Sequence, residues 1–117
     1  MPKKIYRTAI YCRLSREDGD KVESNSIASQ RAICEDFISR HDDLEMVCEP
    51  FVDDGYSGVS FNRPSFKKLE DAIRKGGIDC IVVKDLSRFS RNYIDGGRYL
   101  EKIFPQLGIR FIAVNDA

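Results

Sequence analysis

The fold of this chain is decided by a short run of sequence, TAIYCRLS, which covers residues 8–15. From Thr8 to Leu14 the residues are mostly β-branched, aromatic or otherwise apolar. Such a composition predicts a β-strand that is buried on both faces, as strands are in parallel sheets. The polar residue Ser15 would follow the carboxyl end of that strand.

Three further runs have the same character and predict three more strands: Met46–Val52, Asp79–Lys84 and Arg110–Asn115. Helical patterns lie between the strands. This alternation predicts an α/β fold of three layers, in which a mostly parallel sheet of four or more strands carries helices on both faces. In such folds a functional site forms beyond the carboxyl ends of the strands.

Local signals place the helices along the chain. The expected starts are the N-cap Ser26, the first helical residue Pro64, and Asn92 or Tyr93. The second helix is expected to stop at Gly76-Gly77, because glycine accepts the backbone conformation that ends a helix. Pro105 predicts that the third helix ends early or is distorted, because proline removes one helical hydrogen bond.

The length of 117 residues predicts a single domain. Its 19 Lys and Arg balance its 19 Asp and Glu, so we expect weak binding of duplex DNA by the domain alone, despite a local basic excess in residues 84–110. The sequence has no apolar run of the roughly 20 residues that a membrane span needs. Residues 1–8 lack the apolar stretch of a secretion signal. We therefore expect a cytoplasmic protein with no membrane partner.

The cysteines give no sign of a metal site. Cys12, Cys34, Cys48 and Cys80 lack the short spacing of zinc ligands, and the only histidine is His41. We expect the cysteines to be small buried apolar side chains in a reducing compartment.

The first strand carries an unusual basic residue. Because side chains alternate along a strand, Tyr11, Arg13 and Ser15 would share one face. An arginine in a sheet buried on both faces is costly unless something negative satisfies it. One interpretation is that Asp53, Asp54 or Asp85 pairs with Arg13 and that Ser15 caps a turn. The other is that Arg13 binds a phosphate toward which Ser15 is oriented.

A second basic group follows the third predicted strand, in the segment of residues 84–92. Arg88 and Arg91 are three residues apart at the entrance to a helix, so helical geometry would point them the same way. Cations oppose the helix dipole at that end, and a bound anion would resolve the conflict. The alternative is a solvated basic loop.

Arginines and a serine together suit attack on a phosphodiester. Guanidinium groups remain protonated and bind two phosphate oxygens at once. Serine is a weak nucleophile unless a second group activates it. His41 is predicted at the far end of the first helix, which argues against a Ser-His-Asp triad. Arginine electrostatics would have to substitute, with Asp54 or Gln30 positioning the hydroxyl of Ser15.

Four motifs occur in order along the chain at compatible spacing. They are Tyr11-x-Arg13-x-Ser15, Ser26-Ile27-x-x-Gln30, Asp54-Gly55-Tyr56-Ser57-Gly58 with Asn62-Arg63-Pro64, and Val83-Lys84-x-Leu86-x-Arg88-x-x-Arg91-Asn92. Together they resemble the serine site-specific recombinases, a family of resolvases, DNA invertases and large serine integrases and transposases. The resemblance continues to Asp116 and covers nearly the whole chain.

This resemblance implies that Ser15 forms a transient 5′-phosphoserine linkage to DNA before strand exchange and religation. The scissile phosphate would be held by Arg13, Arg63, Arg88 and Arg91, with support from Tyr11, Gln30, Asp54, Ser57 and Lys84. No cofactor or metal would be required. The implied partners are double-stranded DNA at a specific recombination site and further copies of the chain, as a homodimer or homotetramer of the full-length protein.

The chain also differs from parts of the family. The long stretch between Ser15 and Ser26 resembles the large, transposon-encoded branch, and Ser87 stands where many members carry aspartate, which puts an acid–base role at that position in doubt. Members continue into a long helix that joins subunits and into separate DNA-binding domains. We therefore expect residues 1–117 to be the catalytic domain of a longer protein, inactive alone, with the loop Asp54–Arg63 mobile in the absence of DNA.

Two alternatives stay open. The first is a receiver-like signalling domain, with Asp53 or Asp54 as phosphoacceptor and Lys84 as its partner. Receivers also need an acidic cluster after the first strand to hold Mg²⁺, and basic residues flank Ser15 there instead. The second is an inactive recombinase-like domain kept for assembly, against which the retention of Ser15 and all four arginines argues.

Overall fold

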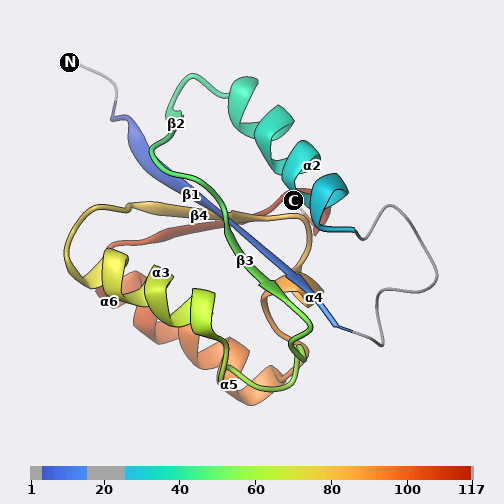
Figure 1. The fold of residues 1–117 in the computed structure, drawn as a ribbon. Helices are drawn as coiled ribbons and strands as arrows, with labels where there is room; N and C mark the ends of the chain where they lie inside the picture. Colours follow the sequence, from blue (N-terminus) through green and yellow to red (C-terminus); the bar gives the residue numbers. More distant parts are fainter. Residues whose placement is uncertain (1–3, 16–25, 117) are drawn as a thin grey trace.

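A computed structural model describes residues 4–15 and 26–116 of the chain. Its strands are β1 (Tyr6–Leu14), β2 (Leu44–Met46), β3 (Phe51–Asp54), β4 (Cys80–Val83) and β5 (Arg110–Ala113). They form a five-stranded sheet in the order β2-β1-β4-β5, with β3 paired to β1 as well. Every one of these pairings is parallel, and β1 runs through the middle of the sheet (Figure 1). The predicted parallel sheet is confirmed.

The predicted strand Met46–Val52 is wrong in one respect, because it is two strands rather than one. β2 ends at Met46 and pairs with the start of β1, whereas β3 begins at Phe51 and pairs with the end of β1. Pro50 lies directly before β3 and has no N–H to donate to a ladder, which accounts for the interruption.

The other strand predictions hold with small shifts at their ends. β1 begins earlier than predicted, at Tyr6, and β4 is slightly shorter than the predicted run. β5 ends at Ala113, and the residues after it form a 3₁₀ turn, η3 (Val114–Asp116), instead of continuing the strand to Asn115.

The helices of the described chain are α2 (Ile27–Ser39), α3 (Pro64–Arg74), α4 (Leu86–Phe89), α5 (Tyr93–Arg98), the π-helical turn η2 (Tyr99–Ile103) and α6 (Phe104–Gln106). The predicted starts are confirmed. The hydroxyl of Ser26 accepts a hydrogen bond from the backbone of Ser29 at 3.1 Å, and Pro64 opens α3. Gly76, just beyond α3, has a φ of 86°, the left-handed conformation expected at a helix end.

The third predicted helix is distorted before Pro105, as expected. It starts at Tyr93, where the side chain of Asn92 accepts hydrogen bonds from two backbone N–H groups, and it widens into η2 before α6. The expectation that Arg88 and Arg91 share this helix entrance is wrong. Arg88 belongs to the separate short helix α4, and Arg91 lies in the loop between α4 and α5, because Ser90 adopts an extended conformation.

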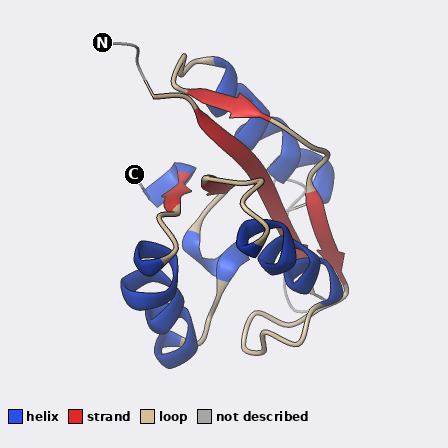
Figure 2. Cartoon of the chain, turned by 90° about the vertical axis from the view of Figure 1, so that its left-hand side faces the viewer, coloured by secondary structure: helices blue, strands red, loops and turns tan. Residues whose placement is uncertain are grey.

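Helices cover both faces of the sheet, which confirms the three-layer prediction (Figures 1 and 2). On one face α2 packs Cys34 and Ile38 against β1 and β4. On the other face α3, α4 and α6 contribute a core rich in aromatic rings, with Phe66, Phe89 and Phe104 all buried.

The cysteines of the described chain are free thiols. Cys12, Cys34 and Cys80 are buried as predicted, whereas Cys48 is half-buried. Burial raises the pKa of the Cys12 thiol to about 12, so this side chain stays neutral and packs as an apolar group. Among the described residues, no helix is long and apolar enough to cross a membrane.

Candidate active site

The carboxyl ends of β1, β3 and β4 bring polar side chains together at one end of the sheet. Ser15 directly follows β1 and is 6% exposed, and Lys84 directly follows β4 and is 7% exposed. Asp54 is the last residue of β3 and is exposed. The short helix α4 contacts β1 beside them, and hydrogen bonds between Arg13 and Arg88 join the two elements, so Arg88 lies at the same end of the sheet as Ser15.

The guanidinium of Arg13 is completely buried, and backbone carbonyls surround it. Nε donates to the oxygen of Arg88 at 3.2 Å, Nη1 to that of Tyr56 at 2.9 Å, and Nη2 to that of Ser87 at 2.6 Å. One interpretation of the sequence paired Arg13 with a carboxylate inside the protein. Acceptors inside the protein do bind this guanidinium, but the acceptors of these three bonds are main-chain carbonyls. These bonds join β1 to α4 and to the loop of residues 55–63, which we call the glycine-rich loop.

Gln30 is buried on α2 and pairs with the backbone of Arg13. Its Oε1 accepts from the N–H of Arg13 at 3.2 Å, and its Nε2 donates to the carbonyl of Arg13 at 3.0 Å. This is the pairing that a neighbouring strand would offer at that point. The same carbonyl also accepts from Nη1 of Arg88 at 3.1 Å. Gln30 thus fixes the chain two residues before Ser15.

Arg63 is also completely buried and connects the glycine-rich loop to α4. Nε donates to the carbonyl of Ser60 at 2.7 Å, Nη1 to that of Phe89 at 2.6 Å, and Nη2 to that of Gly58 at 3.2 Å. The guanidinium lies 4.6 Å from the centre of the Phe61 ring, a cation–π distance. In this conformation Arg63 holds protein segments together.

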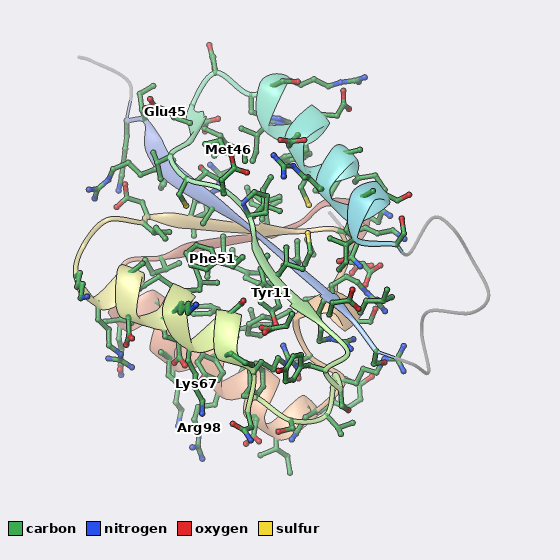
Figure 3. All side chains as sticks on the ribbon, in the orientation of Figure 1. Tyr11, Glu45, Met46, Phe51, Lys67 and Arg98 are labelled. Atoms are coloured by element: carbon green, nitrogen blue, oxygen red, sulfur yellow. The ribbon has the colours of Figure 1, made fainter. Side chains whose placement is uncertain are left out.

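Tyr11 and Asp53 form a buried pair next to Arg63. The Tyr11 hydroxyl donates to Oδ2 of Asp53 at 2.8 Å, and burial raises the pKa of Tyr11 well above its ordinary value. Figure 3 labels Tyr11 among the side chains near β3. Its ring meets that of Phe66 on α3 edge-on. The sequence analysis gave Tyr11 a supporting role but gave Asp53 no role in the recombinase site. One signal could have pointed to Asp53: Arg63, the N-cap residue of α3, forms no capping hydrogen bond through its side chain, so another residue has to supply the acceptor.

Arg88 is 2% exposed and contacts Ser87 and Asp85. Its Nε and Nη2 lie 3.3 and 3.2 Å from Oγ of Ser87, and Nε lies 3.7 Å from Oδ1 of Asp85. The Ser87 hydroxyl donates to that same carboxylate oxygen, which also caps α4 by accepting from the backbone of Arg88. Asp85 therefore supplies a carboxylate beside Arg88, although position 87 carries none.

Arg91 is exposed, unlike the other three arginines of the site. Its N–H donates to the carbonyl of Gly58 at 2.7 Å. Gly58 lies so close that a Cβ there would be 2.8 Å from Nη2 of Arg13 and 2.9 Å from Cγ of Arg91. A side chain at this position would force the side chains of Arg13 and Arg91 to shift, so glycine is what allows their present close approach. Beside Arg91 lies a hollow of about 510 Å³ whose lining includes Ser87 and Tyr93.

The glycine-rich loop is tied to the end of β1. The carbonyl of Leu14 accepts from the N–H of Gly55 at 2.6 Å and from that of Tyr56 at 3.1 Å. Ser57 stabilises the loop internally, since its hydroxyl accepts from the N–H of Val59 at 3.1 Å. The mobility expected of this loop without DNA stays a prediction, and these bonds are what an opening of the loop would break.

His41 lies just beyond the carboxyl end of α2, as predicted, and stacks on Phe37 with the ring centres 4.1 Å apart. Ser15, by contrast, follows β1 at the carboxyl ends of the strands.

The segment of residues 16–25, whose length suggested the transposon-encoded branch, lies outside the described residues.

Comparison with known proteins identifies the family of the chain. Residues 8–117 match the family described as Resolvase, N terminal domain. The chain is 31% identical over 87 residues to a "Putative DNA recombinase" of Bacillus subtilis (strain 168), a match that covers 74% of this chain and 16% of that protein. The chain thus spans about a sixth of the length of this relative.

Solved structures show the same fold. The N-terminal catalytic domain of TP901-1 integrase superposes with a TM-score of 0.80 at 26% identity, over 94% of this chain and 78% of that one. A resolvase family site-specific recombinase from Streptococcus pneumoniae superposes with a TM-score of 0.73 at 30% identity, over 97% and 74% of the two chains. From the family match over residues 8–117 and the shared fold, we conclude that this chain belongs to the resolvase N-terminal domain family.

Proposed function

We propose that this chain is the catalytic domain of a serine site-specific recombinase that cuts and rejoins double-stranded DNA. The observation that carries the proposal is the position of Ser15, directly after β1 and two residues beyond Arg13, whose guanidinium touches the backbones of Ser87 and Arg88. Ser15, the proposed nucleophile, thus lies at the same end of the sheet as the guanidinium groups of Arg13 and Arg88. Residues 1–117 would form this domain within a longer protein.

In the proposed reaction Oγ of Ser15 attacks a backbone phosphorus atom of DNA. A bond forms between Oγ and phosphorus while the bond from phosphorus to the 3′ oxygen breaks. The serine gives up its proton, and the leaving 3′ oxygen gains one. The product is a 5′-phosphoserine linkage and a free 3′ hydroxyl. After strand exchange, a 3′ hydroxyl attacks the linkage and restores both the DNA backbone and Ser15.

The arginines would stabilise the negative charge that builds up on the phosphate oxygens. Removing one preorganised donor of this kind costs on the order of 3–4 kcal/mol of transition-state stabilisation. Arg91 is exposed and would meet the phosphate first. Arg13, Arg63 and Arg88 are held by carbonyl groups, so their engagement requires the loop or α4 to shift and phosphate oxygens to replace those carbonyls. Binding of DNA would drive that exchange.

The supporting residues have separate proposed tasks. Gln30 keeps the end of β1 in place through the Arg13 backbone, and Ser57 shapes the loop. Lys84 adds positive charge at the end of β4, and Asp54 lies where the loop begins. In place of an aspartate at position 87, Asp85 would act on Arg88 through the Ser87 hydroxyl.

The proposed partners are a specific DNA site and other copies of the full-length protein, as a dimer or tetramer. A neutral domain draws little nonspecific affinity from phosphate contacts, so other parts of the longer protein would supply most of the DNA affinity. The receiver-like alternative loses support for Asp53 as phosphoacceptor, because its carboxylate is 1% exposed and already accepts from Tyr11 and from the start of α3.

Replacement of the nucleophile tests the proposal. In the full-length protein, Ser15→Ala should abolish strand cleavage and leave DNA binding nearly intact, because binding depends on other groups. Cleavage of end-labelled DNA on a denaturing gel and a binding titration give the two readouts. Cleavage at the wild-type rate by Ser15→Ala would rule out Ser15 as the nucleophile.

A further inference from the structure

We propose that Gly96, a buried residue of α5, is a positioning residue for DNA cleavage, because it leaves space for the side chain of Ser90 and so fixes the backbone that carries Arg91. This inference rests on the proposed function, in which the exposed guanidinium of Arg91 meets the phosphate. It concerns a glycine that lies outside the four motifs of the sequence, and it assigns that glycine a steric task.

The first step is the place of Arg91 in the chain. Arg91 lies between α4 and α5, and its N–H donates to the carbonyl of Gly58 in the glycine-rich loop at 2.7 Å. Its side chain also starts against that glycine, since a Cβ at Gly58 would lie 2.9 Å from Cγ of Arg91. The direction in which the Arg91 side chain leaves the protein therefore depends on the backbone of residues 90–92.

The second step is a tight turn that Ser90 and Asn92 form around Arg91. The Ser90 hydroxyl donates to the carbonyl of Asn92 at 3.0 Å and accepts from its N–H at 2.9 Å. The Asn92 side chain accepts from two backbone N–H groups at the start of α5 and donates to the carbonyl of Val59 at 3.3 Å. Arg91 is thus held on a turn whose two ends are joined to each other, and one of these ends is the N-cap of α5.

The third step is the contact of this turn with α5. Gly96 lies inside the helix, where the backbone conformation suits any residue, so its own backbone does not call for glycine. The space around it does, because a Cβ at Gly96 would lie 2.9 Å from Oγ and 3.0 Å from Cβ of Ser90. At the adjacent Gly97 a Cβ would meet nothing beyond its own helix within 4 Å. A methyl group is therefore obstructed at Gly96 and accommodated at Gly97.

A methyl group at Gly96 would displace a neighbour of Arg91, whichever segment gave way. Ordinary contact begins near 3.4 Å, so Ser90 and α5 would have to separate by about half an ångström. Rotation of the Ser90 hydroxyl cannot relieve the contact with Cβ, which is bonded directly to the backbone, so the backbone of Ser90 would shift. If α5 shifted instead, it would carry Asn92 with it, because Asn92 is its N-cap.

The test compares single-turnover cleavage at saturating DNA, and DNA affinity, among variants of the full-length protein. Each variant is assayed at a temperature at which circular dichroism shows it to be fully folded. We expect Gly96→Ala to bind DNA as the wild type does and to cleave about 10-fold more slowly, because a misplacement of about 1 Å can cost about 100-fold and this one is about half as large. Gly97→Ala is the matched control on the same helix and should cleave at the wild-type rate.

A second pair of variants tests whether the effect passes through Ser90. Ser90→Gly removes both atoms that the methyl group would meet, so it makes room for alanine at position 96. Ser90→Gly alone also loses the hydroxyl bonds to Asn92 and should cleave more slowly than the wild type. Addition of Gly96→Ala to Ser90→Gly should slow cleavage no further.

Four results would overturn the positioning role. They are a wild-type cleavage rate in Gly96→Ala, an equally slow Gly97→Ala, an equal slowing by Gly96→Ala with and without Ser90→Gly, and a Gly96→Ala protein that does not fold at any temperature. The last result would mean that the contact supports the fold instead of the position of Arg91. A wild-type protein that forms no Ser15 adduct would instead overturn the proposed function itself, and the positioning role with it.

Discussion

Replacement of Gln30 by alanine should strongly lower the free energy of unfolding of the domain. The change removes both hydrogen bonds to the Arg13 backbone. The Arg13 carbonyl retains its bond from Arg88, so losing the bond from Gln30 costs this carbonyl about 1 kcal/mol. The Arg13 N–H is left buried without this acceptor, which costs about 1–3 kcal/mol. The sum is about 2–4 kcal/mol, a large part of the roughly 5–15 kcal/mol by which a domain is stable.

Urea unfolding of the chain, followed by circular dichroism, measures this loss. Arg31→Ala is the matched control, because Arg31 neighbours Gln30 on α2 but forms exposed ion pairs with Glu35 and Glu49, which contribute little. The midpoint should fall strongly for Gln30→Ala and hardly at all for Arg31→Ala. Equal, small shifts in both variants would refute the idea that Gln30 fixes the end of β1.

Three further predictions concern the arginines, acid stability and the isolated chain. Arg88→Lys and Arg91→Lys should each slow cleavage, because lysine lacks the planar two-pronged contact, and full activity of the combined variant would favour a merely solvated basic loop. The bond from Arg7 lowers the pKa of Asp79 to about 2 from an ordinary 3.8. This pair should therefore stabilise the fold above pH 3.8 and lose its effect as the pH falls toward 2, so unfolding curves of wild type and Asp79→Asn should converge in acid. The isolated chain should fold but form no covalent DNA adduct at low salt, and an adduct at ordinary protein concentration would contradict this.

Much of the fold was predictable from local signals. Ser26, Pro64 and Pro105 act within a turn or two of their own positions, so the sequence alone placed two helix starts and one distortion. The interruption at Pro50 was just as local, but the apolar residues on both sides of it favoured one continuous strand. The interruption at Ser90 has neither a proline nor a glycine beside it in the sequence, and for that reason Arg88 was assigned to the wrong helix.

The candidate site residues could be named from the sequence, but their contacts could not. Arg13 stands out in the sequence because its neighbours Cys12 and Leu14 are apolar, whereas Arg63 was named only because its motif resembles that of the family. Their acceptors are carbonyls of distant segments, such as Tyr56 and Phe89, which become neighbours only when the chain folds. The same reason explains the missing role of Asp53, which caps a helix that begins eleven positions later in the chain, at Pro64.

The most direct test of the central claim is to locate the covalent bond between protein and DNA. The full-length protein would be incubated with DNA that carries its recombination site, quenched with denaturant, digested and analysed by mass spectrometry. The account predicts a nucleotide joined through its 5′ phosphate to Ser15, and no such adduct in Ser15→Ala. An adduct on any other residue, or DNA cleavage without a covalent intermediate, would contradict it.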